Sequence, residues 1–352
     1  MHKHLRRIIL SLVVISAAIS GSLISRPQTV VAAEGEFYLE VSPSPLVTTL
    51  KPGESKTLDF KIRNAGPKAE NLKIEPRSFK VNDSTGEIQF DDTKPPEIAD
   101  WINFKAKTFT VNPGEWYDQQ LTINVPKDAG FSYSFAMLIT RDSKTSPQPG
   151  RSIKAQIGIF VLLNIDRPGA IRKLEIEKVS TDKGIYEYLP STINVRLKNT
   201  GNTIAQPAGD IFIQRNSNDS TPIDNLAVNG KGGYILPGTV RVLSTQWDDG
   251  FPIKRTITTD AGTSEKLEWN WASLSKIRVG YYTAKVVAVY NDGQRNIPIT
   301  GEVGFWVIPW KILGALLIIV ILLGVGIWSL ITKVFGFSQF RHKSTKIKRM
   351  KN

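Results

Sequence analysis

Histidine and cysteine, which carry much of hydrolytic catalysis and zinc binding, are missing from the central part of this 352-residue chain. The three histidines are His2, His4 and His342, and the sequence contains no cysteine. Ser-His-Asp and Cys-His catalysis, His- or Cys-ligated zinc and disulfide bonds are therefore excluded from residues 34–311. Carboxylate chemistry or a Ser-Lys pair remains, and Ser-Lys pairs are too common in any chain to be informative.

Two adjacent acid pairs, Asp91–Asp92 and Asp248–Asp249, are the candidates for carboxylate chemistry. A glycosidase needs two carboxyl groups roughly 5–10 Å apart across a cleft, and calcium needs several oxygen ligands. Both pairs lie among turn residues, where Asp is common for backbone reasons, and the Asp-x-Asp-x-Asp-Gly spacing is absent. We therefore predict no catalytic residue, no metal and no cofactor. A carboxylate-dependent carbohydrate-active enzyme is kept as an alternative.

Aromatic residues give the stronger binding signal, because flat rings stack on sugars and anchor protein interfaces. Trp116 and Tyr117 follow a Pro-Gly turn, and Trp101 follows a Pro-rich loop. We predict Trp101, Trp116 and Tyr117 as ligand-binding residues. The competing interpretation is that each Trp fills the core of a sandwich. Trp269 and Trp271 alternate, so they should share one face and could be core residues together.

Alternating polar and apolar residues dominate the region that would carry these side chains. Residues 58–63, 121–125 and 193–198 show period-two alternation, separated by turns rich in Asn, Gly and Pro. This pattern is typical of half-buried strands in antiparallel sheets. The Pro-Gly interruption at Asp166–Ala170 predicts a domain boundary. We expect an all-β fold of two tandem immunoglobulin-like β-sandwiches, comprising residues 34–166 and 171–308.

A weak internal repeat supports two similar domains. In each half, a proline-led turn precedes a strand that ends at an Asn, namely Asn64 in the first half and Asn199 in the second. A Pro-Gly turn follows later in each half, at Pro113–Gly114 and Pro237–Gly238, again before an alternating run. The repeat is one of motif type without close sequence identity. It predicts similar folds without proving common descent.

An apolar segment near the C-terminus predicts one transmembrane helix. Residues 312–331 contain no charged side chain and span about 30 Å in a helix, enough to cross a bilayer core. Trp306, Trp310 and Trp328 lie near its ends, as is typical of membrane interfaces. The tail at 332–352 holds seven Lys or Arg and no acid. This basic tail predicts a cytoplasmic C-terminus.

Residues 1–33 resemble a secretory signal peptide in composition. Basic residues precede an apolar run from Ile8 to about Ile19, and small residues follow at Val31–Ala33. Cleavage before Glu34 is expected, with an uncleaved second anchor as the alternative because Arg26 lies in a long cleavage region. Either way, we predict a single-pass protein of the cell membrane with extracellular domains before the helix.

The net charge of +13 is explained by topology and does not indicate nucleic-acid binding. Four Lys or Arg lie in residues 1–33 and seven in the tail, which leaves 34 basic residues between them against all 32 acids. The exported region is therefore nearly neutral, and we predict no nucleic-acid partner. Binding to anionic lipid headgroups is the competing interpretation of the basic tail, but a positive-inside signal explains the tail fully.

The order of several short motifs in the first domain resembles the peptidoglycan-binding domain of WxL-interacting proteins, a family of Gram-positive surface proteins. The segments that carry the resemblance are Phe37–Pro43, Leu50–Gly53 with the strand that follows it to Asn64, Ser84–Ile88, Asp100–Ile102, Val111–Glu115 and Leu121–Pro126. The resemblance covers the first domain only. It implies a protein that binds cell-wall polymer and partner surface proteins.

Two classes of function follow from these observations. The first is a non-enzymatic, membrane-anchored surface protein whose outer domain binds cell-wall polymer or a partner surface protein. The alternative is an exported assembly factor or chaperone that acts by strand addition, which needs an unpaired edge strand. The apolar run Ile153–Leu163 is the candidate for such an edge, and a buried strand is the competing interpretation.

Overall fold

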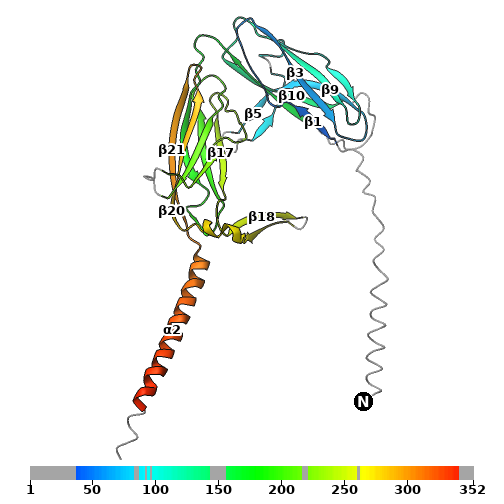
Figure 1. Ribbon diagram of the computed structural model, residues 1–352. Helices are drawn as coiled ribbons and strands as arrows, with labels where there is room; N and C mark the ends of the chain where they lie inside the picture. Colours follow the sequence, from blue (N-terminus) through cyan, green and yellow to red (C-terminus); the bar gives the residue numbers. More distant parts are fainter. Residues whose placement is uncertain are drawn as a thin grey trace, which may run out of the picture.

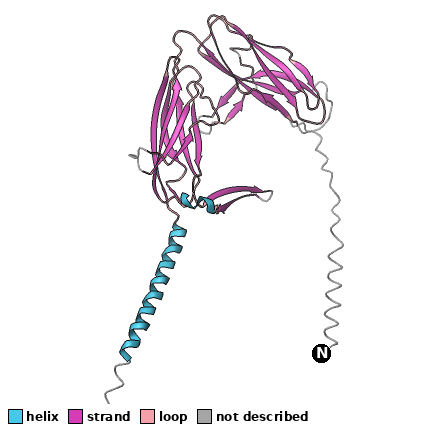
Figure 2. Cartoon of the chain, in the orientation of Figure 1, coloured by secondary structure: helices cyan, strands magenta, loops and turns pink. Residues whose placement is uncertain are grey.

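The computed structural model describes residues 37–340, apart from 83–86, 92, 96, 143–155, 216–220 and 260–261. These residues form two β-sandwiches in tandem, followed by one long helix (Figures 1 and 2). The predicted all-β fold class is therefore confirmed. The predicted signal peptide and residues 341–352 of the basic tail lie outside the described residues.

The first sandwich contains two sheets. Sheet A has the order β1-β3-β9-β7, with β1 (Leu39–Ser42), β3 (Ser55–Asn64), β9 (Trp116–Asn124) and β7 (Ile102–Phe104). Sheet B has the order β2-β11-β10-β4-β8, with β2 (Leu46–Leu50), β11 (Gln156–Ile165), β10 (Ser132–Arg141), β4 (Glu70–Arg77) and β8 (Thr108–Val111). A separate hairpin joins β5 (Phe79–Val81) to β6 (Ile88–Phe90).

Alternation along the strands builds the core between these sheets. Phe60 and Ile62 on β3 and Leu121 and Ile123 on β9 are fully buried, and their neighbours in sequence face outward. Because successive side chains of a strand point to opposite faces, every second residue enters the core. Sheet A therefore presents one polar outer face.

The first strand of this domain changes sheets halfway along. β1 pairs antiparallel with β3, whereas β2 pairs parallel with β11. Pro43 and Pro45 lie between β1 and β2, and proline has no N–H to donate to a ladder. Each half-strand consequently covers only part of its neighbour. β2 reaches Val161–Ile165 of β11 and leaves Gln156–Phe160 without a strand on that side among the described residues.

The second sandwich repeats this plan. One sheet has the order β12-β14-β17, with β12 (Leu174–Thr181), β14 (Ser191–Asn199) and β17 (Val240–Trp247). The other has the order β13-β21-β20-β15-β16, with β13 (Ile185–Tyr186), β21 (Asn296–Val307), β20 (Gly280–Asn291), β15 (Ala208–Gln214) and β16 (Asp224–Ala227). Its first strand likewise divides between sheets. Both sandwiches therefore have the strand order typical of immunoglobulin-like domains.

Two buried asparagines give the internal repeat a structural meaning. Asn64 donates from Nδ2 to the carbonyls of Lys68 (2.7 Å) and Val111 (3.0 Å), and its Oδ1 accepts from the N–H of Gly66 (2.9 Å). In the second domain, Asn199 makes the same three kinds of bond, with the Thr203 carbonyl (2.8 Å), the Ile235 carbonyl (2.9 Å) and the Gly201 N–H (2.9 Å). Each Asn joins the end of a strand to the following turn.

The sandwiches contact each other through an asparagine side chain. Asn164 donates from Nδ2 to the carbonyl of Ile204 (3.1 Å), and its Oδ1 accepts from the N–H of the same residue (2.9 Å). The Ser132 hydroxyl also donates to the carbonyl of Asn202 (3.0 Å). These bonds hold the C-terminal end of β11 against the second domain. Figure 1 shows the two sandwiches set at an angle to each other.

The helix α2 (Trp310–Phe340) begins two residues after Ile308 and continues from β21. Within its segment Trp310–Lys333, the most apolar 18 residues have a mean hydropathy of 2.7, and they are not buried against the sandwiches. This segment is long and apolar enough to cross a membrane. The second domain is therefore held close to the start of that span.

Candidate functional site

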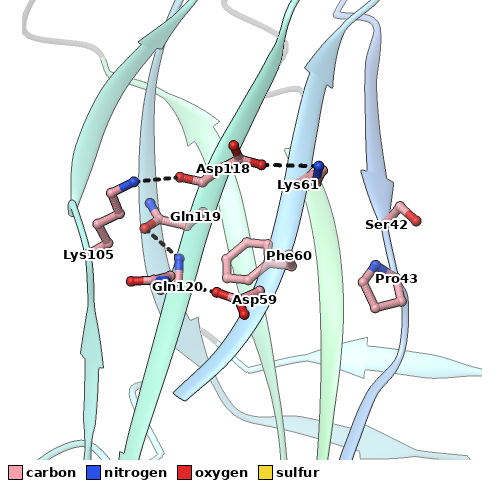
Figure 3. A pocket seen from close by; sticks show the side chains of 9 residues that line it. All are labelled: Ser42, Pro43, Asp59, Phe60, Lys61, Lys105, Asp118, Gln119 and Gln120. Atoms are coloured by element: carbon pink, nitrogen blue, oxygen red, sulfur yellow. Dashed lines mark hydrogen bonds and ion pairs between the residues drawn. The ribbon is translucent and has the colours of Figure 1, made fainter.

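The outer face of sheet A holds a shallow polar depression of about 490 Å³ (Figure 3). On its floor, Lys61 forms an ion pair with Asp118 (3.4 Å). Gln120 donates to a carboxylate oxygen of Asp59 (2.9 Å). Lys105 donates to the backbone carbonyl of Asp118 (3.3 Å). The face offers charges and amides that already hydrogen-bond one another, a composition suited to a hydroxyl-rich ligand.

Trp116 lies on the same outer face of β9 as Asp118 and Gln120. Its side chain is 48% exposed, and the guanidinium of Arg63 lies 6.0 Å from its ring centroid. Arg63 is in turn paired with Glu40 of β1 (3.2 Å). Trp116 thus adds an exposed aromatic ring to one end of the polar face.

Trp101 and Tyr117, the other two predicted binding residues, point elsewhere. The Trp101 ring packs edge-on against Tyr133, with centroids 4.8 Å apart, and it contacts the core. Tyr117 stacks on Phe109 at 4.5 Å and also packs against the core. Trp101 lies next to β7, whose residue Ile102 pairs with Ile123 at the far end of β9 from Trp116. The structure does not bring the three residues together.

These positions predict different effects of alanine substitution. Trp101→Ala should lower the free energy of unfolding by about 2–4 kcal/mol, because it removes a core-packed ring. Trp116→Ala should change it by less than about 1 kcal/mol, because the ring is half exposed. Urea unfolding followed by circular dichroism checks this, and equal losses would contradict the assignment of Trp116 to the outer face.

A strand edge on sheet B that has no neighbouring strand among the described residues forms a second candidate site, which we call the β11 edge and define as Gln156–Phe160. The N–H of Ile165 donates to Phe131 on the β10 side, whereas the N–H of Asp166 donates to Leu50 on the β2 side. Backbone groups alternate along a strand. Gly158 therefore directs its N–H and C=O away from β10, toward the side that β2 leaves open.

Apolar side chains accompany this edge. Phe160 projects from β11 on the outer face of sheet B, where it contacts Phe79 (5.2 Å between centroids) and Phe90 (6.1 Å). Phe90 is 40% exposed, and Val47 of β2 is 41% exposed. On the other face, Ile157 is only partly buried against the core. An added strand would find apolar contacts on both of its faces.

The candidate edge Ile153–Leu163 was only partly recognisable from sequence. Residues 153–155 lie outside the described residues, and Ile159, Val161 and Leu163 are buried, as the competing interpretation expected. Residues 156–160 form an edge because β2 begins too late to pair with them. The alternation of residues in β11 does not show where β2 begins. Gly158 was the available signal, because a glycine inside a strand often marks a close backbone approach.

In the second acid pair, Asp248–Asp249, the carboxylate of Asp249 forms ion pairs. It contacts Lys276 (2.6 Å) and Arg278. Burial alone would raise the pKa of Asp249, but hydrogen bonds from Lys276 and Arg278 outweigh burial and hold that pKa below its ordinary value of 3.8. A general acid needs the opposite shift. Asp92 lies outside the described residues, so the first pair has no structural description.

The lowered pKa of Asp249 predicts a specific acid sensitivity. Because the folded-state pKa lies below the unfolded-state value, the charged carboxylate stabilises the second domain above about pH 4, and this contribution is lost as the pH falls through the folded-state pKa. Asp249→Asn should lower stability at pH 7 and show a smaller further loss between pH 5 and pH 2. Thermal unfolding at several pH values checks this, and parallel pH profiles would contradict it.

The tryptophans of the second domain separate into two environments. Trp247 is fully buried, in contact with the rings of Tyr282 and Phe305. Trp269 and Trp271 do share a face, since they stack with centroids 5.9 Å apart. The prediction that they could be core residues is wrong, because both are exposed. They follow a hairpin that leaves the sandwich.

Comparison with known proteins gives little beyond the fold. No family model matches the chain, and no curated protein matches it. Among solved structures, it is similar to the class 5 fimbriae chaperone CfaA, with 13% identity and a TM-score of 0.35 over 66% of this chain and 99% of that one. It is also similar to the YadV chaperone, with 9% identity and a TM-score of 0.33 over 76% and 99%. These values are too low to indicate a shared function.

Proposed function

We propose that this chain is a non-enzymatic, membrane-anchored assembly factor that holds extended segments of exported proteins by strand addition to the β11 edge. The observation that carries the proposal is Gly158, whose backbone N–H and C=O face a side where the described part of the chain places no strand, beside Phe160 and Phe90. Main-chain hydrogen bonds would supply affinity, and the flanking apolar side chains would supply selectivity.

The rest of the architecture suits such a role. In the second domain, β13 pairs with β21 only at Trp306–Val307, and the side chains of Val179 and Ile176 on β12 lie against Gly301 farther along β21. The β11 edge belongs to the first domain, which α2 and the second sandwich would hold away from the membrane. We propose that both sandwiches lie outside the cell and that the basic tail lies in the cytoplasm. Charge asymmetry of the flanks supports this orientation.

A capture experiment tests this function. The full chain, purified in detergent, is incubated separately with exported proteins and with insoluble cell wall from the same cells. Strand addition predicts saturable, salt-resistant retention of unfolded or incompletely assembled exported chains, because backbone bonds and apolar contacts are weakly screened. Retention on the wall alone would overturn the proposal in favour of the polymer-binding function.

Polymer binding on sheet A is the second candidate, favoured by the exposed Trp116 at the end of the polar depression. It agrees with what the resemblance to WxL-interacting proteins implies. Trp116→Ala should then abolish retention on insoluble peptidoglycan while the protein stays folded. Asn103→Ala, on the exposed side of β7, is the matched control. Unchanged retention of the Trp116 variant would remove this candidate site.

A further inference from the structure

The base of the second domain exposes a group of apolar side chains beside the start of α2. We call Trp269, Trp271, Leu274 and Ile277 the membrane-proximal platform. Trp271 is 68% exposed and Leu274 is 49% exposed, although both belong to a folded segment. They lie on or next to the short 3₁₀ helix η1 (Trp271–Lys276), which follows the hairpin of β18 (Ile253–Thr259) and β19 (Gly262–Glu268).

Specific contacts hold the platform in place. Trp269 and Trp271 both contact the ring of buried Phe251, with centroids 5.7 Å and 5.4 Å away. Asn270 caps η1 by accepting from the N–H of Ala272 (3.2 Å). Lys276 is tied to Asp249 at the end of β17. The exposed Trp rings therefore pack against Phe251, and the segment that carries them is tied to the sandwich.

Short contacts place this surface at the level of the helix start. Phe251 and Pro252 line one small cavity together with Val307 and Pro309, and Pro309 immediately precedes α2. Lys254 donates its backbone N–H to Leu189 (2.7 Å). Figure 1 shows β18 projecting sideways from the base of the sandwich, close to the first turn of α2 and across its axis. A membrane crossed by α2 would run parallel to this projection.

The hairpin lacks a second layer of protein. β18 and β19 form a sheet of two strands, and within the described residues most of their side chains are exposed. A two-stranded hairpin is marginally stable in water unless it packs against something. An unpartnered hairpin joined to a rim of exposed Trp, Leu and Ile indicates a surface whose partner is outside the sandwich.

We propose that the membrane-proximal platform sits in the headgroup layer of the bilayer that α2 crosses. Tryptophan favours this layer, because its ring is apolar and its N–H is polar. The surface continues from α2, whose own Trp310 is exposed at the same end. Seating the platform fixes the tilt of the second domain on the membrane. The proposal rests on the membrane anchoring included in the proposed function.

Single-cysteine labelling tests the platform directly, because the natural chain has no cysteine. Full-length Leu274→Cys is labelled with an environment-sensitive fluorophore and reconstituted in phosphatidylcholine vesicles. Gln294→Cys is the matched control: it lies in the turn at the opposite end of β21, roughly 40 Å from α2 at about 3.3 Å per residue. Ile319→Cys, in α2, reports whether the helix enters the bilayer.

The proposal predicts that doxyl-labelled lipid quenches the labels at 274 and 319 but not at 294, and that iodide quenches only the label at 294. Quenching at 319 with iodide access at 274 would overturn the platform and leave anchoring intact. Loss of lipid quenching at both positions would overturn both. Protection of 274 from iodide without lipid quenching, rising with protein density, would assign the surface to a second copy and overturn the lipid partner.

Discussion

Gly158→Pro should reduce retention of exported chains at least tenfold while Gly158→Ala leaves it nearly unchanged. Proline removes the N–H that Gly158 directs to the open side, and edge strands tolerate proline there. Both substitutions add the Cβ that would approach Phe90 (3.1 Å) and Leu138 (3.3 Å), so alanine controls for packing. The retained amount is measured by quantitative immunoblotting.

Equal retention by the proline and alanine variants would contradict strand addition at the β11 edge. Equal loss by both would indicate that the side-chain contact with Phe90 matters and the backbone does not. Circular dichroism must first show that the proline variant keeps its unfolding midpoint. Because the Gly158 N–H makes no ladder bond with β10, we expect only a small loss of stability.

Asn199→Ala should lower the free energy of unfolding of the second domain by about 3–5 kcal/mol, since it leaves two buried carbonyls and one N–H without the side chain that bonds them. Asn64→Ala should have a similar effect on the first domain. Denaturant unfolding of the full chain in detergent measures both.

Asn103→Ala, at an exposed position on β7, is the control and should change stability by less than about 0.5 kcal/mol. A loss below about 1 kcal/mol in either buried variant would contradict the structural account of the repeat, in which each Asn closes the turn after its strand.

Local pattern was enough to predict the sandwiches. The alternation in residues 58–63 and 193–198 lies in β3 and β14, because an alternating strand must bury one of its faces. The Asn at the end of each strand marked equivalent positions. Their three-way hydrogen bonding was not predictable, because the carbonyls that Asn199 binds include one at Ile235, far along the chain.

The sheet face on which each predicted binding residue lies follows from whether its position in the strand is odd or even. Tyr117 has the same parity as Leu121 and Ile123 in β9, so alternation alone assigns it to the core and Trp116 to the outside. Parity fails for Trp269 and Trp271, because they leave β19 for a 3₁₀ helix beyond the edge of the sandwich. Their exposure depends on the tertiary structure around the hairpin and η1, which strand alternation does not describe.

No sequence pattern predicted which part of β11 lies beyond the end of β2. It arises because β2 begins only at Leu46, after Pro45, and therefore meets β11 from Val161 onward. Such a partial overlap is a property of how two distant segments align. Sequence alternation could identify β11 as a strand, but not which part of it lacks a neighbour.

Site-specific crosslinking tests strand addition most directly. Gln156→Cys places a single thiol at the exposed start of the β11 edge, where a benzophenone group can be attached, and Asn103→Cys places one on β7 of sheet A. Irradiation of the full chain with exported proteins should yield crosslinks to extended partner segments from position 156 and few from position 103. Crosslinks from position 103 alone, or none from 156 while partners are still retained, would contradict the proposed function.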